Sequence, residues 1–347
     1  MGTTQLLLCI LGSRPPNSTN IELVRKIDTQ KKIELYLRAT VNKLGFTYLK
    51  ALENSGLIGS GKILENKLKI LEKNYIKYLQ SIKTVSEILN KLRINHVFIK
   101  TIYDFPVIPS DIDLLVEGKI SSILEDNLKK KGLIPFDRGP HFVSFFNTLV
   151  DPYLPREKKC YDVDIYDEIS LSYLVYLDKR YCFDTSDLVT YNGIEAPVPS
   201  PEYELIIHLN HSIFEGLYNL FHFYVYLNLL YKINEIELIE LINKTRSYRA
   251  FKYTSSLTRH FIEKGSLAIN HKHKRIIDYF TGRELILDID ELPYRYSLNQ
   301  VLQLLSEKLN HSQYLRHMLN FAFSILDPLQ MDHVTKQFLM RRKRLTY

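Results

Sequence analysis

The stretch that decides the fold is residues 96–117, which read His-Val-Phe-Ile-Lys-Thr-Ile-Tyr-Asp-Phe-Pro-Val-Ile-Pro-Ser-Asp-Ile-Asp-Leu-Leu-Val-Glu. Two short apolar runs, at 97–99 and 112–116, are separated by a loop that contains two prolines, a pattern that predicts two strands. Because side chains alternate across a strand, we expect Asp111 and Asp113 on the same face. Two such carboxylates repel each other unless a cation lies between them, and a hard divalent ion such as Mg²⁺ meets that need.

A second segment, residues 161–167, supplies further carboxylates. It reads Tyr-Asp-Val-Asp-Ile-Tyr-Asp, and its alternation is typical of a half-buried strand. Asp162 and Asp164 are therefore expected on one face, and a neighbouring strand would bring one of them beside the first pair. An isolated Asp-x-Asp pair is more often a solvated strand end than a metal site. The interpretation of the first pair as a site therefore depends on this third carboxylate.

Taken together, these residues resemble the polymerase-β-type nucleotidyltransferase superfamily, most closely its uncharacterised nucleotidyltransferase branch. The resemblance lies in Lys100, in the run from Ser110 to Val116 and in the later Val-Asp-Ile strand. It implies an α+β fold, in which a mixed sheet has flanking helices, a helical N-terminal preface and a C-terminal helical domain. The three parts implied are an N-terminal helical region, a nucleotidyltransferase core and a C-terminal helical domain, at residues 1–92, 93–199 and 200–347.

The resemblance also implies an activity, the transfer of a nucleoside monophosphate from an NTP to a hydroxyl acceptor with release of pyrophosphate. The acceptor would be an RNA end, a protein or a small molecule. In the family, an Asp-x-Asp pair and a third Asp hold two Mg²⁺ ions, which Mn²⁺ can replace. Carried over to this chain, Asp111 and Asp113 are the catalytic, metal-binding pair, and Asp164 is the third carboxylate, with Asp162 as the alternative. Lys100 matches the basic residue that ends the first strand.

Further residues are expected to bind the nucleotide. Ser110 directly precedes the acidic pair, and His211 lies on a predicted helix similar to one that follows the strands in the family. A basic hairpin residue, Arg138, is a candidate for contact with the triphosphate. Surface turns are commonly basic without any ligand, and His211 is as readily a buried residue. The same expectation, with the same alternative, applies to the basic loop residues Arg156, Lys158 and Lys159.

One departure from the family pattern favours a second hypothesis. Family members usually place Gly after the lysine and a glycine turn beside the phosphates, whereas this chain has Thr101 and no glycine between Lys100 and Asp111. Glycine permits close approach of a backbone to phosphate. The alternative is therefore a catalytically silent member of the fold that acts as a binding or regulatory protein. A third hypothesis is the toxin component of a toxin–antitoxin pair.

Composition and charge limit the kinds of partner and compartment that the chain is expected to have. The chain has 347 residues and a net charge of +7, and residues 241–347 are its basic part. A basic surface suits phosphate-rich partners such as tRNA, and a solvated helix face is the equal alternative. Three cysteines without metal-like spacing indicate a reducing, cytoplasmic compartment. No apolar stretch reaches the ~18 residues that a membrane span needs, so no membrane contact is expected. The oligomeric state stays open.

Periodicity predicts the surrounding elements. Apolar residues at three- and four-residue steps predict helices, period-two alternation predicts strands, and Asn192-Gly193 predicts a hairpin turn. Ser200 as N-cap and Pro201 at the first helical position mark a strong helix start, after which the chain is expected to be helical. The predicted helices are 6–11, 33–57, 63–92 and 120–131, and the predicted strands are 133–136, 141–146 and the pair around Asn192.

Overall fold

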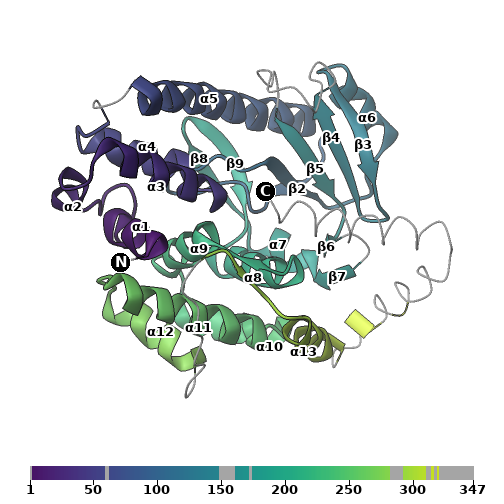
Figure 1. Ribbon diagram of the computed structural model, residues 1–347. Helices are drawn as coiled ribbons and strands as arrows, with labels where there is room; N and C mark the ends of the chain where they lie inside the picture. Colours follow the sequence, from purple (N-terminus) through teal and green to yellow (C-terminus); the bar gives the residue numbers. More distant parts are fainter. Residues whose placement is uncertain are drawn as a thin grey trace.

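Residues 96–117 form an edge strand and its neighbour in a five-stranded sheet in the computed structural model (Figure 1). The structure describes residues 2–58, 62–147, 161–171, 174–281, 292–309, 314–315 and 319. The sheet has the order β1-β2-β5-β4-β3 and is mixed, since β2 and β5 are parallel and the other neighbours are antiparallel. The predicted α+β class with a mixed sheet is confirmed. The strands are β1 (His96–Phe98), β2 (Asp111–Val116), β3 (Leu133–Arg138), β4 (Phe142–Asn147) and β5 (Asp162–Tyr166).

One face of this sheet is covered by two helices, α5 (Lys62–Lys91) and α6 (Ser122–Lys129). The apolar residues of the central strands alternate onto that face, where they form a core with α5 and α6. Their polar neighbours must therefore lie on the opposite face. The buried residues that the strands contribute to this core are Phe98, Ile112, Leu114, Val116, Leu133, Val143, Phe145, Val163 and Ile165.

The N-terminal part is helical, as predicted, but divided differently. The single helix expected over 33–57 is wrong, because the chain leaves the helical path at Asn42 and Lys43. Lys43 has a φ of 60°, and the Asn42 side chain donates a hydrogen bond to the carbonyl of Arg38 at 3.0 Å, which ends the first helix. A short helix at 21–25 was not predicted. The helices before α5 are α1 (Thr3–Leu11), α2 (Ile21–Arg25), α3 (Thr29–Val41) and α4 (Gly45–Asn54).

Two hairpins follow the sheet. The first, β6 (Ile169–Leu171) with β7 (Leu174–Leu177), is not among the predicted strands. The second, β8 (Asp187–Tyr191) with β9 (Ile194–Val198), was predicted from its turn. Asn192 and Gly193 both have positive φ, 49° and 78°, the conformation that favours these residue types in a two-residue turn. Between the hairpins lies α7 (Lys179–Asp184).

The remainder is mainly helical, as predicted. The side chain of Ser200 accepts a hydrogen bond from the backbone N–H of Tyr203 at 3.3 Å, and α8 (Pro201–Phe214) starts at Pro201. A two-stranded ladder between β10 and β11 was not predicted. Within the described ranges, no helix is both long and apolar enough to span a membrane. The other elements are α9 (Leu220–Leu230), α10 (Glu235–Thr245), α11 (Tyr248–Gly265), α12 (His271–Thr281), α13 (Leu298–Leu309), β10 (Leu217–Tyr218) and β11 (Tyr294–Arg295).

Candidate active site

Four carboxylates lie side by side on the face of the sheet opposite to α5 and α6. In the parallel pair of β2 and β5, Asp111 lies beside Asp162 and Asp113 lies beside Asp164. Side chains of directly adjacent residues in neighbouring strands project to the same face. The sheet therefore brings the predicted acidic pair together with both candidates for the third carboxylate.

Electrostatic interactions connect Asp164 with the acidic pair. Asp113 is 7% exposed, and burial raises its pKa to about 6 against the pull of the Lys100 ammonium. Burial, together with the charges of Asp111 and Asp113, raises the pKa of Asp164 to about 7. Asp164 thus interacts electrostatically with both members of the pair. Its Oδ2 atom also accepts a hydrogen bond from the Tyr166 hydroxyl at 3.4 Å.

Lys100 supplies the positive charge of this cluster. Its Nζ lies 3.1 Å from Oδ2 of Asp113, and both side chains are about nine-tenths buried. The same ammonium lies 5.7 Å from the centre of the Tyr166 ring. Removing either partner of such a buried ion pair destabilises the fold, because the other charge is left uncompensated. The structure thus brings Lys100, which follows the first strand as predicted, directly beside Asp113.

The backbone at Lys100 has an unusual conformation that several contacts stabilise. Its φ is 49°, in the left-handed region that costs a non-glycine residue about 1–2 kcal/mol. Its N–H donates to Oε1 of Glu204 at 2.6 Å, and its carbonyl accepts from the Tyr103 hydroxyl. The hydroxyl of Thr101 donates to the carbonyl of Asp113 at 3.1 Å and accepts from the N–H of Asp113 at 3.0 Å. These contacts hold the end of β1 against β2 and α8.

His211 lies next to Lys100 and belongs to a polar network from α8. Its Nε2 is 3.4 Å from Nζ of Lys100 and 3.2 Å from Oε1 of Glu215, and its Nδ1 is 3.4 Å from the Tyr176 hydroxyl. Burial acts to raise the pKa of Glu215, yet the neighbouring His211 and the lysines Lys43 and Lys100 hold it well below its usual range. The network extends the cluster from the sheet into the helical part.

The remaining predicted residues are placed as follows. The hydroxyl of Ser110 donates to Oδ1 of Asp111 at 3.0 Å, at the exposed edge of the cluster. Arg138 is not brought to the carboxylates, because its guanidinium pairs with Glu125 of α6 at 2.6 Å, on the helix-covered side of the sheet. Arg156, Lys158 and Lys159 lie outside the described residues.

Sequence reasoning missed several groups around Lys100. In the sequence, Glu204 is an acidic residue in the first turn of a predicted helix, a position where acidic residues are favoured by the helix dipole whatever their function. Nothing in the pattern distinguishes it from Glu202, which instead accepts from the backbone N–H of Asn234. Tyr176 lies in a strand that was not predicted, and Glu215 follows the end of α8. Their roles depend on tertiary contacts over long sequence separations.

The cluster fits a hard divalent cation in its chemistry but is not closed around one. Carboxylate oxygens are the ligands that Mg²⁺ prefers, and the raised pKa values of Asp113 and Asp164 indicate an excess of negative charge in a buried place. Within the part of the chain that the structure describes, no three His, Cys, Asp or Glu side chains are gathered in an arrangement able to hold a metal ion. Instead, Lys100 occupies one oxygen of Asp113.

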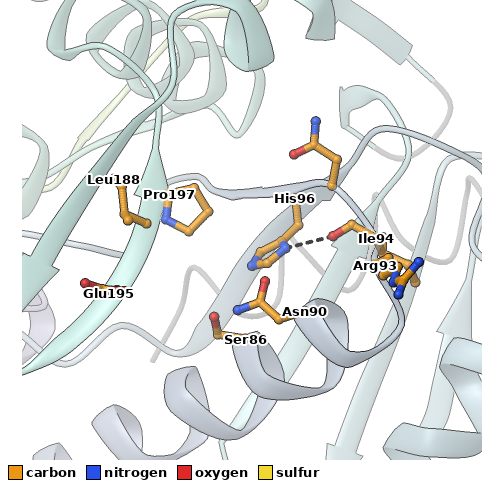
Figure 2. Close-up of a pocket in the computed structure, with 9 residues that line it drawn as sticks. Ser86, Asn90, Arg93, Ile94, His96, Leu188, Glu195 and Pro197 are labelled. Carbon is orange, nitrogen blue, oxygen red and sulfur yellow. Dashed lines mark hydrogen bonds between the residues drawn. The ribbon is translucent and has the colours of Figure 1, made fainter.

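A separate hollow lies at the other end of β1 (Figure 2). It has a volume of about 460 Å³ and is lined by α5, β1 and the second hairpin. The buried imidazole of His96 faces it, with Nδ1 3.0 Å from the carbonyl of Ile94. None of the predicted site residues lines this hollow.

The comparisons with known proteins add no family assignment. No protein-family model matches the chain, and no curated protein or solved structure is significantly similar to it. The functional interpretation therefore rests on the residues and their geometry.

Proposed function

We propose that this protein is a metal-dependent nucleotidyltransferase. The observation that carries the proposal is the placement of Asp111, Asp113 and Asp164 on one sheet face, with Lys100 as their buried counter-charge. Such an assembly is costly to the fold, because buried like charges raise one another's pKa. Strongly perturbed pKa values are enriched at functional sites, and this supports the proposal.

Asp111, Asp113 and Asp164 would hold the divalent ion. When bound, Mg²⁺ or Mn²⁺ would neutralise phosphate charge and lower the pKa of an acceptor hydroxyl. The chain's own contribution is positioning. Lys100 is held by Glu204 and Tyr103 beside Asp113, where its ammonium can bind a triphosphate oxygen. Asp164 lies on the far side of the pair from Lys100, where it would face an acceptor hydroxyl.

One observation favours the silent binding protein as a second candidate. The Lys100 ammonium already forms an ion pair with Asp113 at 3.1 Å. In the described residues, the three carboxylates are not gathered in an arrangement able to hold a metal ion. A protein that used the fold only to bind a partner would keep such an ion pair as a structural element. The two candidates differ in whether the pair opens when an NTP and a divalent ion are supplied.

The test is incubation of the purified protein with each α-³²P-labelled NTP, Mg²⁺ or Mn²⁺, total RNA and cell lysate. The Asp111→Ala/Asp113→Ala protein is the inactive comparison, and Asp162→Asn is the matched control from the same face. We expect label transfer by the wild type and by Asp162→Asn, and none by the double variant. No transfer with any NTP by folded protein would support the binding candidate. Loss of transfer in Asp162→Asn as well as in the double variant would reassign the third carboxylate to Asp162.

A further inference from the structure

The exposed face of α5 carries positive charge and no negative charge over most of its length. The helix runs along the outside of the molecule (Figure 1), and its apolar side is packed into the protein. From residue 62 to residue 83, every exposed residue of α5 is Lys, Ile, Asn or Gln. The two glutamates of this stretch, Glu65 and Glu72, are half-buried, and Glu72 pairs with Lys50 of α4.

The lysines of this face are not neutralised by neighbouring side chains. A solvated helix face commonly balances its charges with ion pairs three or four residues apart. Such pairs occur in α2, α3, α4, α6 and α11, whereas the described part of the chain has none within the 30 residues of α5. The exposed lysines without an ion-pair or hydrogen-bond partner among the described residues are Lys62, Lys67, Lys69, Lys73 and Lys83.

Four of these residues form a line along the helix, which we call the lysine stripe: Lys62, Lys69, Lys73 and Lys83. Their separations of seven, four and ten residues keep them within about 80° of arc, at about 100° per residue. At about 1.5 Å per residue, the stripe is about 32 Å long. A linear polyanion with regularly spaced charges could therefore pair with all four ammonium groups at once.

The buried side of the same helix contacts two segments that lead into the candidate site. The hydroxyl of Tyr78 donates to the carbonyl of Thr101, next to Lys100, at 2.6 Å. The hydroxyl of Ser81 accepts from the backbone N–H of Tyr161, directly before β5, at 3.0 Å. Because a helix is about 10 Å across, the stripe lies about that distance from these segments. A strand bound along α5 would therefore pass close to the edge of the candidate site.

We propose that the lysine stripe binds the phosphate backbone of a single-stranded RNA, the acceptor of the transferred nucleotide. The inference rests on the proposed function in naming this strand as the acceptor, whereas the binding itself needs no catalysis. An RNA strand carries a negative charge at each nucleotide, and lysines that neutralise phosphates release condensed counterions. The exposed amides of Asn66 and Gln80 can donate further hydrogen bonds to phosphate oxygens.

The exposed isoleucines of this face, Ile63, Ile70 and Ile76, do not make it a membrane-binding surface. A helix that lies on a bilayer inserts an apolar face into it. The apolar face of α5 is already occupied by the two hydrophobic cores, and the three isoleucines are interspersed among lysines. The arrangement therefore suits a strand that follows the lysines better than it suits a bilayer.

The test measures binding without any NTP. A fluorescein-labelled oligouridylate of about 16 nucleotides is titrated with the protein, and fluorescence anisotropy is recorded between about 50 and about 200 mM salt. Lys69→Gln/Lys73→Gln removes two charges from the stripe and retains the helix, since Gln and Lys have similar helix propensities. The matched control is Lys244→Gln/Lys252→Gln, which removes two exposed lysines from α10 and α11 in the basic C-terminal part.

We expect the stripe variant to bind more weakly and with less dependence on salt. Each phosphate neutralised on a single strand contributes about −0.7 to the slope of log K against log salt. The stripe should therefore contribute about −3 in the wild type, and the variant should lose about half of this. The same relation predicts roughly 25-fold weaker binding by the variant at about 0.1 M salt, whereas the control should resemble the wild type.

Equal affinity and slope for the stripe variant and the wild type would overturn the inference, as would an equal loss in the control. Vesicles of equal parts phosphatidylcholine and phosphatidylserine, and polyglutamate, are added as competitors at the same total charge as the RNA. Displacement of the RNA by either would overturn it in favour of a membrane or an acidic protein. RNA binding through the stripe without label transfer from any NTP would keep the RNA surface and reject the proposed transfer. Transfer by a protein that binds no RNA would do the reverse.

Discussion

Replacing Asp164 by Asn tests whether the carboxylate cluster is the costly, functional assembly described above. The amide keeps the shape of the side chain and removes its charge. In the wild type, burial and the two neighbouring carboxylates raise the pKa of Asp164 from 3.8 to about 7. A group whose pKa is higher in the folded state stabilises the fold at low pH and loses that contribution as pH rises through the folded pKa. In the absence of metal, this one group should therefore make the wild type less stable, relative to Asp164→Asn, as pH rises from 4 to 8.

The magnitude follows from the two pKa values. Integrating the proton linkage between pH 4.5 and pH 8 gives a loss of about 3 kcal/mol from this one group. Asp164→Asn should lack that loss, so its free energy of unfolding relative to the wild type should rise by about 3 kcal/mol over the same range. Equilibrium urea unfolding in EDTA at four pH values measures the difference.

A second arm adds the metal. Mg²⁺ binds the ionised cluster in the native state and stabilises it by mass action, so at pH 8 the wild type should recover stability with millimolar Mg²⁺ and Asp164→Asn should recover less. Parallel pH profiles for the two proteins would refute the reasoning about burial and charge. A pH difference without any response to Mg²⁺ or Mn²⁺ would retain the cluster but reject the metal.

Three other variants test the contacts around the site and the helical part. Lys100→Met should lower the free energy of unfolding by about 3 kcal/mol at pH 8, because it leaves Asp113 as an uncompensated buried charge. The loss should be much smaller at pH 5, where Asp113 is protonated, and urea unfolding at both pH values measures the difference. Glu204→Gln keeps an acceptor for the Lys100 N–H but removes the negative charge of the side chain. Calorimetric titration should therefore show Mg-ATP binding weakened severalfold, or by about 1 kcal/mol. Unchanged binding would contradict a positioning role for Glu204. Burial lowers the pKa of Lys308 from 10.5 to about 7, so this group costs the fold stability as pH falls. Relative to Lys308→Met, the wild type should therefore gain about 2–3 kcal/mol of unfolding free energy from pH 6 to pH 9, a difference that thermal unfolding at both pH values measures.

Much of the sheet could be predicted because its strands carry local signals. The alternation in 111–116 and 162–166 gave both the strands and the common face of their carboxylates. The Asn192-Gly193 turn and the Ser200 cap act within a few residues, so they are visible without tertiary information. These are the features for which local sequence and global fold agree.

The parts that could not be predicted depend on contacts between distant segments. The break between α3 and α4 occurs in a sequence with continuous helical periodicity, and only the cap at Asn42 and the turn at Lys43 reveal it. Arg138 has the charge expected of a phosphate ligand, but strand register directs it to Glu125 on the other face. Charge and turn position were sufficient to suggest a role, whereas the register decides the side of the sheet.

The structure shows what Thr101 contributes at a position where the resemblance predicts glycine. The left-handed conformation that a glycine would make easy occurs one residue earlier, at Lys100, and is stabilised there by Glu204 and Tyr103. Thr101 then uses its hydroxyl to bridge to the backbone of Asp113, a contact that glycine cannot make. The side chains of Glu204 and Thr101 thus fix the loop that glycine would leave flexible. A rigid loop of this kind is compatible with both candidate functions, and what separates them is whether the Lys100–Asp113 pair opens to admit an NTP and a divalent ion.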